Sequence, residues 1–286
     1  MTRRLRLAIP NKGRLVEPTV RLLRDAGLVF EADDRALVAR VQNFDLDILF
    51  VRTNDIVEFI NDGVAELGVT GLDLVAESGT DAPLVRKLGY GRCRLTLAVP
   101  NDSPFRAAED LAGLRVATSH MGLTKRFFAE RAIPVDVIPV SGAAEVAPRL
   151  GLAEAIVDLV STGSTMVVNG LRPVEEIFAS EAVLLANKTA LAERPDVIDS
   201  INTMLSATLA ARDRKYLMMN APKSKLAELE NLLPGLESPS IIPLAHEGMI
   251  AIHSVVEADQ VWSLLPRLKA AGASGILILP IEKLVP

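Results

Sequence analysis

The segment AIVDLVSTGST, residues Ala155 to Thr165, decides how this part of the chain folds. Its first six residues are apolar except for Asp158, and small polar residues follow them. A short apolar run that ends in small polar residues predicts a buried strand followed by a tight turn. We therefore expect a strand over Ala155–Val160, a turn at Gly163 and the start of a helix directly after the turn.

The composition of this turn favours binding of a phosphate group. Gly163 lets backbone N–H groups come close to a ligand, and at a helix start these groups face an anion together with the positive end of the helix dipole. Asp158, at the strand end, is placed to accept hydrogen bonds from sugar hydroxyls or to help hold a hydrated Mg²⁺. Ordinary capping of a helix by Ser or Thr explains the same composition. The hydroxyls that converge on the turn are those of Thr162, Ser164 and Thr165.

The composition of the whole chain narrows the class of protein. Its 286 residues, 49% of them apolar, suffice for two or three domains with separate cores. We expect no membrane association, because no run approaches the length of a transmembrane helix and the N-terminus lacks a signal-peptide pattern. The single cysteine, Cys93, fits a reducing cytoplasm. A net charge of −5 argues against nucleic-acid binding, and three scattered histidines give no zinc-site spacing.

Short apolar runs alternate with amphipathic segments, which predicts α/β layers with largely parallel strands. The sheet is expected to be mixed where two strand-like runs follow one another, at Leu84–Leu88 and Arg94–Val99. The other predicted strands are Leu5–Ile9, Leu46–Val51, Glu66–Val69, Leu114–Ala117, Val135–Val140, Ala155–Val160 and Ala182–Ala186. The predicted helices are Arg14–Ala26, Asn54–Asn61, Leu123–Arg131 and Pro195–Arg212.

The breaker cluster Pro100–Pro104 predicts a hinge between two α/β lobes. A return crossing is expected near Ala179–Glu181, so that residues 1–99 and 180–213 form one lobe and residues 100–179 the other. Two lobes joined by two crossings resemble the periplasmic-binding-protein architecture. In such folds the active site lies between the lobes, at the carboxyl ends of the strands.

After Arg214 the pattern changes to the order βαββαβ, which predicts a ferredoxin-like domain over residues 214–286. The predicted helices are Ser224–Leu233 and Ala258–Ala271, and the predicted strands are Tyr216–Met219, Ile241–Leu244, Met249–Val255 and Gly275–Leu279. The alternative to a ligand-binding role is that a domain of this size serves only for oligomerisation.

Basic residues follow two strands of the predicted first lobe. Lys12 and Arg14 lie in the turn NKGRL directly after Leu5–Ile9, and they suit contact with phosphate or pyrophosphate. A solvated basic turn explains the same residues. Arg52 follows the strand Leu46–Val51, where it points to the ligand edge of the sheet or pairs with Asp55.

Residues 145–166 match, position by position, the pattern of one enzyme family. The matching positions are Glu145, Gly151, Ala153, Ile156, Asp158, Leu159, Thr162, Gly163, Thr165 and Met166. The segments RLRLAIPNKGRL, DILFVRTNDI, ELGVTGLDLV, GYGRCRLTLAVP, LRVATSH, KYLMMNAP, PGLESPSIIPL and GASGILILPIEK also look like that family. The chain thus resembles the long form of ATP phosphoribosyltransferase, the first enzyme of histidine biosynthesis.

The resemblance implies transfer of a phosphoribosyl group from 5-phosphoribosyl diphosphate to N1 of ATP, with Mg²⁺. Catalytic roles are implied for Lys12, Arg14, Arg52, Glu145 and Asp158. Sugar-phosphate binding is implied for Asp158, Ser161, Thr162, Gly163, Ser164 and Thr165, and indirect contact with the metal for Glu145 and Asp158. ATP binding is expected of Arg52, Gly71 and Asp73, although Asp73 is equally placed as an acid at a helix N-terminus.

For the C-terminal domain the resemblance implies binding of histidine as an inhibitor. The expected effector residues are Asn220, Ser238, Ser240 and Gly275, in or near the loop PGLESPSI with Glu237 and the turn after Gly272. Asn220 stands where an acid or a histidine is expected in relatives, which leaves its role open. Homodimers that assemble to a hexamer in the cytoplasm are also implied.

Other classes of protein compete with this interpretation. The main alternative is a cytoplasmic two-lobed protein that binds a phosphate ester without transferase activity. An exported solute-binding protein would carry a signal peptide. A salvage phosphoribosyltransferase would show two adjacent acids before the turn, where Asp158 stands alone. A catalytically idle regulatory subunit would not need Glu145 and Asp158 together with STGST.

Overall fold

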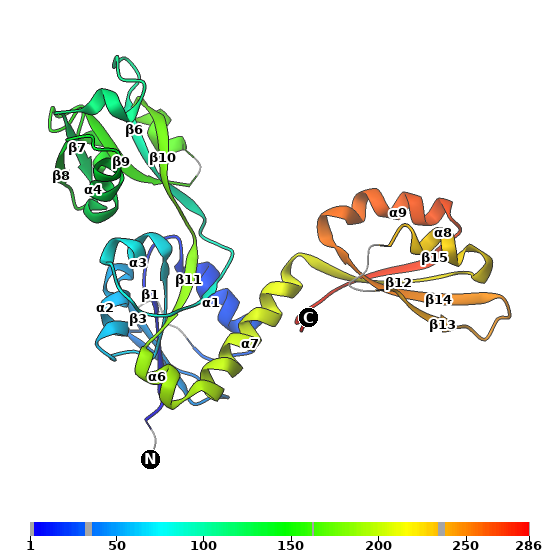
Figure 1. The fold of residues 1–286 in the computed structure, drawn as a ribbon. Coiled ribbons are helices and arrows are strands. Elements are labelled where there is room, and N and C mark those ends of the chain that lie inside the picture. The colour runs from blue at the N-terminus through cyan, green and yellow to red at the C-terminus, as the bar shows by residue number, and fades with distance from the viewer. Residues whose placement is uncertain (1–2, 32–35, 162, 234–237, 286) are drawn as a thin grey trace. The chain divides into compact units, whose positions relative to one another are not determined.

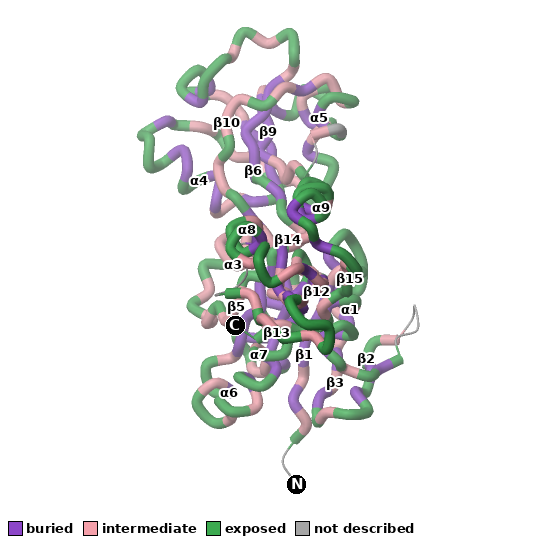
Figure 2. The backbone as a smooth tube through the Cα atoms, turned by 90° about the vertical axis from the view of Figure 1, so that its right-hand side faces the viewer, coloured by how far each residue is buried: buried purple, intermediate pink, exposed green. Residues whose placement is uncertain are grey.

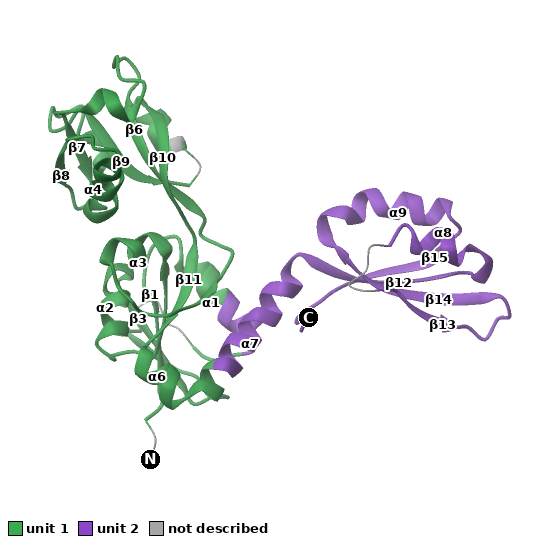
Figure 3. Ribbon diagram, viewed as in Figure 1, with its two compact units in different colours: residues 1–21, 28–198 green, residues 22–27, 199–286 purple. Residues whose placement is uncertain are grey.

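The computed structural model describes residues 3–31, 36–161, 163–233 and 238–285. The chain divides into two compact units, residues 1–21 with 28–198 and residues 22–27 with 199–286 (Figure 3). The first unit contains two mixed sheets with their helices, called here the first lobe and the second lobe (Figure 1). Within the described ranges, no helix combines the length and the apolar character needed to cross a membrane.

The first lobe is built on a six-stranded sheet of order β2-β3-β1-β4-β11-β5. Strand β1 runs parallel to β3 and β4, whereas β2, β11 and β5 join in antiparallel pairs. The strands are β1 Leu5–Pro10, β2 Val38–Arg40, β3 Leu46–Val51, β4 Leu67–Gly71, β5 Leu84–Lys87 and β11 Ala182–Ala186. The helices are α1 Val16–Asp25, α2 Ile56–Asn61, α3 Leu72–Ser78 and α6 Lys188–Glu193, with the 3-10 turn η1 Thr53–Asp55 before α2.

The second lobe is built on a five-stranded sheet of order β10-β6-β9-β7-β8. Strand β7 runs parallel to β8 and β9, and β6 pairs antiparallel with β9 and β10. The strands are β6 Cys93–Pro100, β7 Arg115–Thr118, β8 Asp136–Pro139, β9 Ala155–Val160 and β10 Leu171–Ser180. The helices are α4 Met121–Glu130 and α5 Ser164–Val168, and two 3-10 turns, η2 Ala108–Leu111 and η3 Ala144–Val146, complete the lobe.

The cores of both lobes follow from the apolar runs in the sequence. In β1 the side chains of Leu5, Leu7 and Ile9 on one face and of Ala8 on the other are fully buried, because this inner strand of the sheet is covered on both faces. In β9 burial is complete through Val157 and becomes partial at Asp158. Buried residues follow the central strands (purple in Figure 2). The polar residues Asp158 and Ser161 come at the end of β9, where burial becomes partial. The strand ends are therefore where a ligand can be reached.

Three sequence expectations about the lobes were wrong. The crossing from the first lobe to the second lies between β5 and β6, over residues 88–92, because all of Cys93–Pro100 pairs with β9 and β10 in the second sheet. Pro100–Pro104 is therefore no hinge. The sheets are mixed rather than largely parallel, and β2, β10 and α6 had not been predicted. The return crossing is at Glu181, between β10 and β11, as expected.

The C-terminal sheet has the order β13-β14-β12-β15 with antiparallel pairing throughout. Its strands are β12 Arg214–Pro222, β13 Ser240–Pro243, β14 Met249–Glu257 and β15 Ser274–Pro280. Its helices are α8 Leu226–Glu230, after the turn η4 Lys223–Lys225, and α9 Val261–Ala270, after η5 Ala258–Gln260. This order confirms the ferredoxin-like prediction.

The buried core of this domain lies on the face that carries α8 and α9. Leu217 and Met219 of β12 pack there with Ile252, Leu229 and Leu268. The compact unit is larger than the predicted domain, because it also takes in most of α7, Pro195–Arg212, and residues 22–27 at the end of α1. Residue 214 therefore marks the start of the sheet rather than of the unit.

Candidate active site

Asp158 lies at the carboxyl end of β9, opposite Thr96 of β6. Its Oδ1 accepts a hydrogen bond from the backbone N–H of Leu159 at 2.8 Å. Burial raises the pKa of Asp158, and the negative charge of Glu145 raises it further, against the opposing effects of the Leu159 N–H and His120. The carboxylate is thus held in a site that favours a hydroxyl or cation partner.

The turn after β9 has the backbone that the sequence predicted. Gly163 has φ +80° and serves as the N-cap of α5, a conformation that residues with a Cβ rarely adopt. Ser161 and Thr165 are exposed, and no described residue bonds to either hydroxyl. Thr162 lies outside the described residues. The turn therefore leaves polar groups directed to solvent beside Asp158.

Glu145 reaches the same region from a different element. It lies in η3 after Ala143, whose φ of +51° turns the chain sharply before the helical turn. Its negative charge raises the pKa of the Asp158 carboxyl, although twelve other residues separate the two acids along the chain. The two acids that the sequence singled out therefore influence each other electrostatically in the fold.

The predicted basic residues of the first lobe follow β1 and β3. Lys12 and Arg14 are exposed in the loop after β1, where Gly13 has φ +89°. Arg14 Nη2 donates to the sulfur of Cys93 at 2.8 Å, which ties this loop to the start of β6. Arg52 is exposed at the N-cap of η1, and no ion pair joins it to Asp55 or to another described residue.

Asp73 does not face solvent as an ATP ligand would. It is 2% exposed in the first turn of α3, and its Oδ2 lies 3.2 Å from His120 Nε2. Ser180 donates to its Oδ1 and accepts from its backbone N–H at 3.0 Å. Burial opposes ionisation, but the bonds from His120 and Ser180 outweigh it and lower the pKa of Asp73. A Cβ at Gly71 would collide with Asp73 Oδ1, so Gly71 makes room for this carboxylate.

His120 is the site residue that the sequence reasoning missed. It follows β7 as Ser161 follows β9, and the two strands are parallel neighbours, so both ends meet at one edge of the sheet. The residue is 4% exposed, and its Nδ1 lies 3.1 Å from Ser119 Oγ. The strand-end rule that selected Asp158 would also have selected this position.

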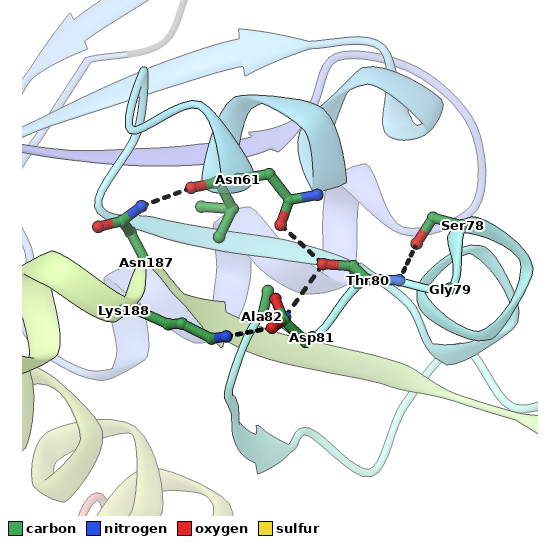
Figure 4. A pocket seen from close by; sticks show the side chains of 9 residues that line it. Asn61, Ser78, Gly79, Thr80, Asp81, Ala82, Asn187 and Lys188 are labelled. Carbon is green, nitrogen blue, oxygen red and sulfur yellow. Dashed lines mark hydrogen bonds and ion pairs between the residues drawn. The ribbon is translucent and has the colours of Figure 1, made fainter.

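A surface hollow of the first lobe lies away from these groups (Figure 4). Its polar lining is already paired, since Thr80 donates to Asn61 at 2.7 Å and Lys188 bonds to Asp81. The hollow is at the end of α3, whereas Asp73 is at its start. It is therefore not part of the candidate site.

Comparison with known proteins agrees with this arrangement. Residues 52–207 match the family model described as HisG: ATP phosphoribosyltransferase, and residues 211–283 match HisG, C-terminal domain. The chain belongs to the ATP phosphoribosyltransferase family. The C-terminal match confirms the expected long form, a transferase of the first step of histidine biosynthesis.

Relatives extend this assignment to nearly the whole chain, and a solved structure is similar over 70% of it. ATP phosphoribosyltransferase of Methanosarcina barkeri is 43% identical, over 99% of this chain and 100% of that protein. The Parabacteroides distasonis enzyme is 40% identical, over 98% of this chain and 99% of that protein. A chain in the structure of the ATP phosphoribosyl transferase (HisG:HisZ) complex from Thermotoga maritima is similar with a TM-score of 0.62 and 28% identity, over 70% of this chain and 95% of that one.

Of the predicted effector residues, Asn220, Ser240 and Gly275 lie on the face of the C-terminal sheet that is opposite to the buried core. Asn220 is next to Gly275, where an added Cβ would lie 3.3 Å from Asn220 Nδ2. Ser240 stands opposite His253, and Asn220 opposite Ala251 two residues along β14, so Ser240 and Asn220 are not neighbours within one chain. Ser238 is exposed, and Glu237 lies outside the described residues.

Members of this family require a divalent metal. Across the described ranges, no group of three or more His, Cys, Asp or Glu residues forms a protein-only metal site. Carboxylates such as those of Glu145 and Asp158, which influence each other electrostatically, are the ligand type that suits a hydrated divalent cation.

Proposed function

We propose that this chain joins ATP and 5-phosphoribosyl 1-diphosphate to give N1-(5-phosphoribosyl)-ATP and diphosphate. One observation carries the proposal. An ionisable acid, Asp158, lies near the end of a buried strand, and a glycine turn with exposed hydroxyls follows that strand, in a chain that matches the family over its length. The acid suits the hydroxyls of a phosphorylated sugar, and the turn suits its phosphate group.

The turn over residues 161–165 binds the 5′-phosphate in this proposal. Its backbone N–H groups and the hydroxyls of Ser161, Thr162, Ser164 and Thr165 supply donors, and Gly163 allows close approach. Asp158 and Glu145 accept hydrogen bonds from the ribose hydroxyls or from the water shell of the metal. The raised pKa of Asp158 supports this role, because a partly buried acid without a cation gains most from a ligand donor.

The leaving diphosphate requires positive charge opposite the turn. Lys12 and Arg14 follow β1, and with Arg52 after β3 they form the basic edge of the first lobe. These side chains neutralise the diphosphate as the anomeric carbon gains positive character. Mg²⁺, when bound near Glu145 and Asp158, would add charge neutralisation and hold substrate oxygens in place.

ATP approaches from the first lobe. Arg52 contacts its phosphates, and the segment from Gly71 to Asp73 borders the adenosine. The reaction requires that adenine N1 of ATP is placed against the anomeric carbon of 5-phosphoribosyl diphosphate, and no covalent nucleophile is needed. Because its carboxylate is bonded to His120 and Ser180, Asp73 would contact ATP only after a change of partner.

Histidine binds the C-terminal domain and inhibits the enzyme in this proposal. Asn220 and Gly275 supply one side of the effector site, and Ser238 and Ser240 of a second copy supply the other. That arrangement requires at least a homodimer, and the dimers assemble up to a hexamer in this proposal. The single cysteine and the biosynthetic role support a cytoplasmic enzyme.

A diphosphate-release assay with both substrates and Mg²⁺, with and without histidine, tests the proposal. We expect diphosphate only when ATP and 5-phosphoribosyl diphosphate are both present, and less of it with histidine. A protein that binds 5-phosphoribosyl diphosphate but releases no diphosphate with ATP would instead be a two-lobed phosphate-ester binding protein.

A further inference from the structure

We propose that Glu77 is a positioning residue that latches the two lobes together, because its carboxylate, from α3 of the first lobe, caps the N-terminus of α4 in the second. Its Oε1 accepts from the backbone N–H of Gly122 at 2.7 Å, and its Oε2 from that of Leu123 at 2.8 Å. The inference rests on the proposed transfer reaction, which requires groups from both lobes.

The N-terminus of helix α4 is not capped by the side chain of its own N-cap residue. Its N-cap residue is His120, which makes no side-chain capping hydrogen bond. The His120 ring instead contacts Ser119 and Asp73, so the first N–H groups of α4 lack an acceptor from their own lobe. Unpaired N–H groups at a helix start are costly when they are away from water, and an acid there also complements the helix dipole. Glu77 supplies both the acceptors and the charge.

The remaining contacts between α3 and α4 favour one arrangement of the lobes. Asp73 and Glu77 are four residues apart on α3, so they lie on one face of the helix, and both contact α4 or its N-cap. Arg126 Nη2 donates to the backbone oxygen of Ala76 at 3.2 Å. A Cβ at Gly122 would lie 3.2 Å from both the backbone oxygen and Oε2 of Glu77, so glycine permits this approach.

The latch acts on the site through His120 and the strand ends beside it. The N-terminus of α4 follows β7, whose neighbour β9 carries Asp158. The basic residues follow β1 and β3 of the lobe that carries Glu77. Fixing α4 against α3 therefore sets the separation between the sugar-phosphate turn and the cations for the diphosphate. Glu77 itself need not touch either substrate.

The full-length variants Glu77→Ala and Glu77→Gln test this inference, with Glu58→Ala as the control. Glu58 is an exposed acid of the same lobe, on α2, and no described residue pairs with its carboxylate. Loss of the latch should lower kcat by about ten- to a hundredfold, the range that a small misplacement of reacting groups produces. The dissociation constant of ribose 5-phosphate, which lacks the diphosphate that the first lobe would contact, should change by less than about twofold in calorimetry because the turn stays intact.

Glu77→Gln keeps an oxygen acceptor for one N–H and should recover part of the lost kcat. Spin labels at Asp62→Cys and Asp136→Cys, one exposed position in each lobe, should give a wider distance distribution in Glu77→Ala than in the parent. Assays well below the unfolding temperature keep the folded fraction equal, so a purely structural role would not lower kcat while leaving sugar-phosphate binding unchanged.

A kcat of Glu77→Ala within about twofold of the parent, or an unchanged distance distribution, would overturn the inference. An equal loss of sugar-phosphate binding would also do so, because it would show damage to the second lobe itself. A parent enzyme that releases no diphosphate would instead contradict the proposed function, and the label distances would still test the latch.

Discussion

Replacing Asp158 by Asn should lower activity strongly without weakening the fold. In the structure Oδ1 already accepts the Leu159 N–H, so Oδ2 and the second lone pair of Oδ1 are left for a ligand. A hydrogen bond to a charged group contributes about 1.5–3 kcal/mol. Two bonds to ribose hydroxyls therefore amount to about 3–6 kcal/mol, and Asn keeps one acceptor oxygen. We expect the lower end, about a hundredfold loss in kcat/KM.

Although Asp158→Asn should lower activity, it should not lower the stability of the apo protein. The pKa of Asp158 is raised by burial and by Glu145 above its value in the unfolded chain, which is about 3.9. A raised carboxyl pKa means that the ionised form destabilises the fold, so stability falls as pH rises through the folded pKa. Asn removes this charge, and the apo variant should be at least as stable as the parent at neutral pH.

The assay is initial-rate diphosphate release, combined with thermal unfolding of the apo protein. Asp136→Asn is the matched control, because Asp136 is exposed at the opposite end of the same sheet, at the start of β8. A rate like that of the parent would remove Asp158 from the mechanism. A lower unfolding temperature would show that the carboxylate stabilises the apo fold, contrary to the reasoning from its pKa.

Three further predictions concern stability and regulation. The pKa of Asp73 is lowered because the bonds from His120 and Ser180 outweigh the cost of burial. The ionised Asp73 carboxylate therefore stabilises the fold fully above the pKa it has in the unfolded chain, about 3.9, and this stabilisation is lost as pH falls through the pKa it has in the folded protein. Urea unfolding across that acid range should therefore depend less on pH in Asp73→Asn, and an unchanged slope would contradict the assignment. Gly68→Ala would place a Cβ 2.7 Å from Ile56 Cγ2 and should cost about 1–3 kcal/mol, and an unchanged urea midpoint would show that the core adapts. Asn220→Ala should raise the histidine concentration for half inhibition by about tenfold or more, with Ser263→Ala on α9 as the control, and unaltered inhibition would put the effector elsewhere.

The sequence determined the central strands because their patterns are local. The bounds of β3, β9 and β11 were predicted to the residue, since each is an apolar run that ends at polar or turn-forming residues. The long helix Pro195–Arg212 was equally clear from Pro195 and Asp196 at its start. The C-terminal βαββαβ order also followed from apolar runs alone.

Elements at the edges of the sheets gave a weaker signal. Strand β10 contains Pro173 and several charged residues, and it was missed because an edge strand with one solvated face need not be apolar. The crossing over residues 88–92 was displaced to Pro100–Pro104 in the prediction, because breaker residues mark turns without showing which sheet the next strand joins. Only the pairing of β6 with β9 and β10 decides that point.

The sequence likewise determined which residues bear the chemistry of the sugar-phosphate turn, since Asp158, Gly163 and their neighbours form one local motif. Contacts between the lobes were decided by the tertiary structure alone. Asp73 meets His120 across 47 positions and Glu77 meets Gly122 across 45. No local pattern encodes such pairs, because they arise only when two separately folded sheets bring α3 against α4. The sequence therefore predicts which strand ends carry the site residues. The positions of these residues relative to one another depend on long-range packing.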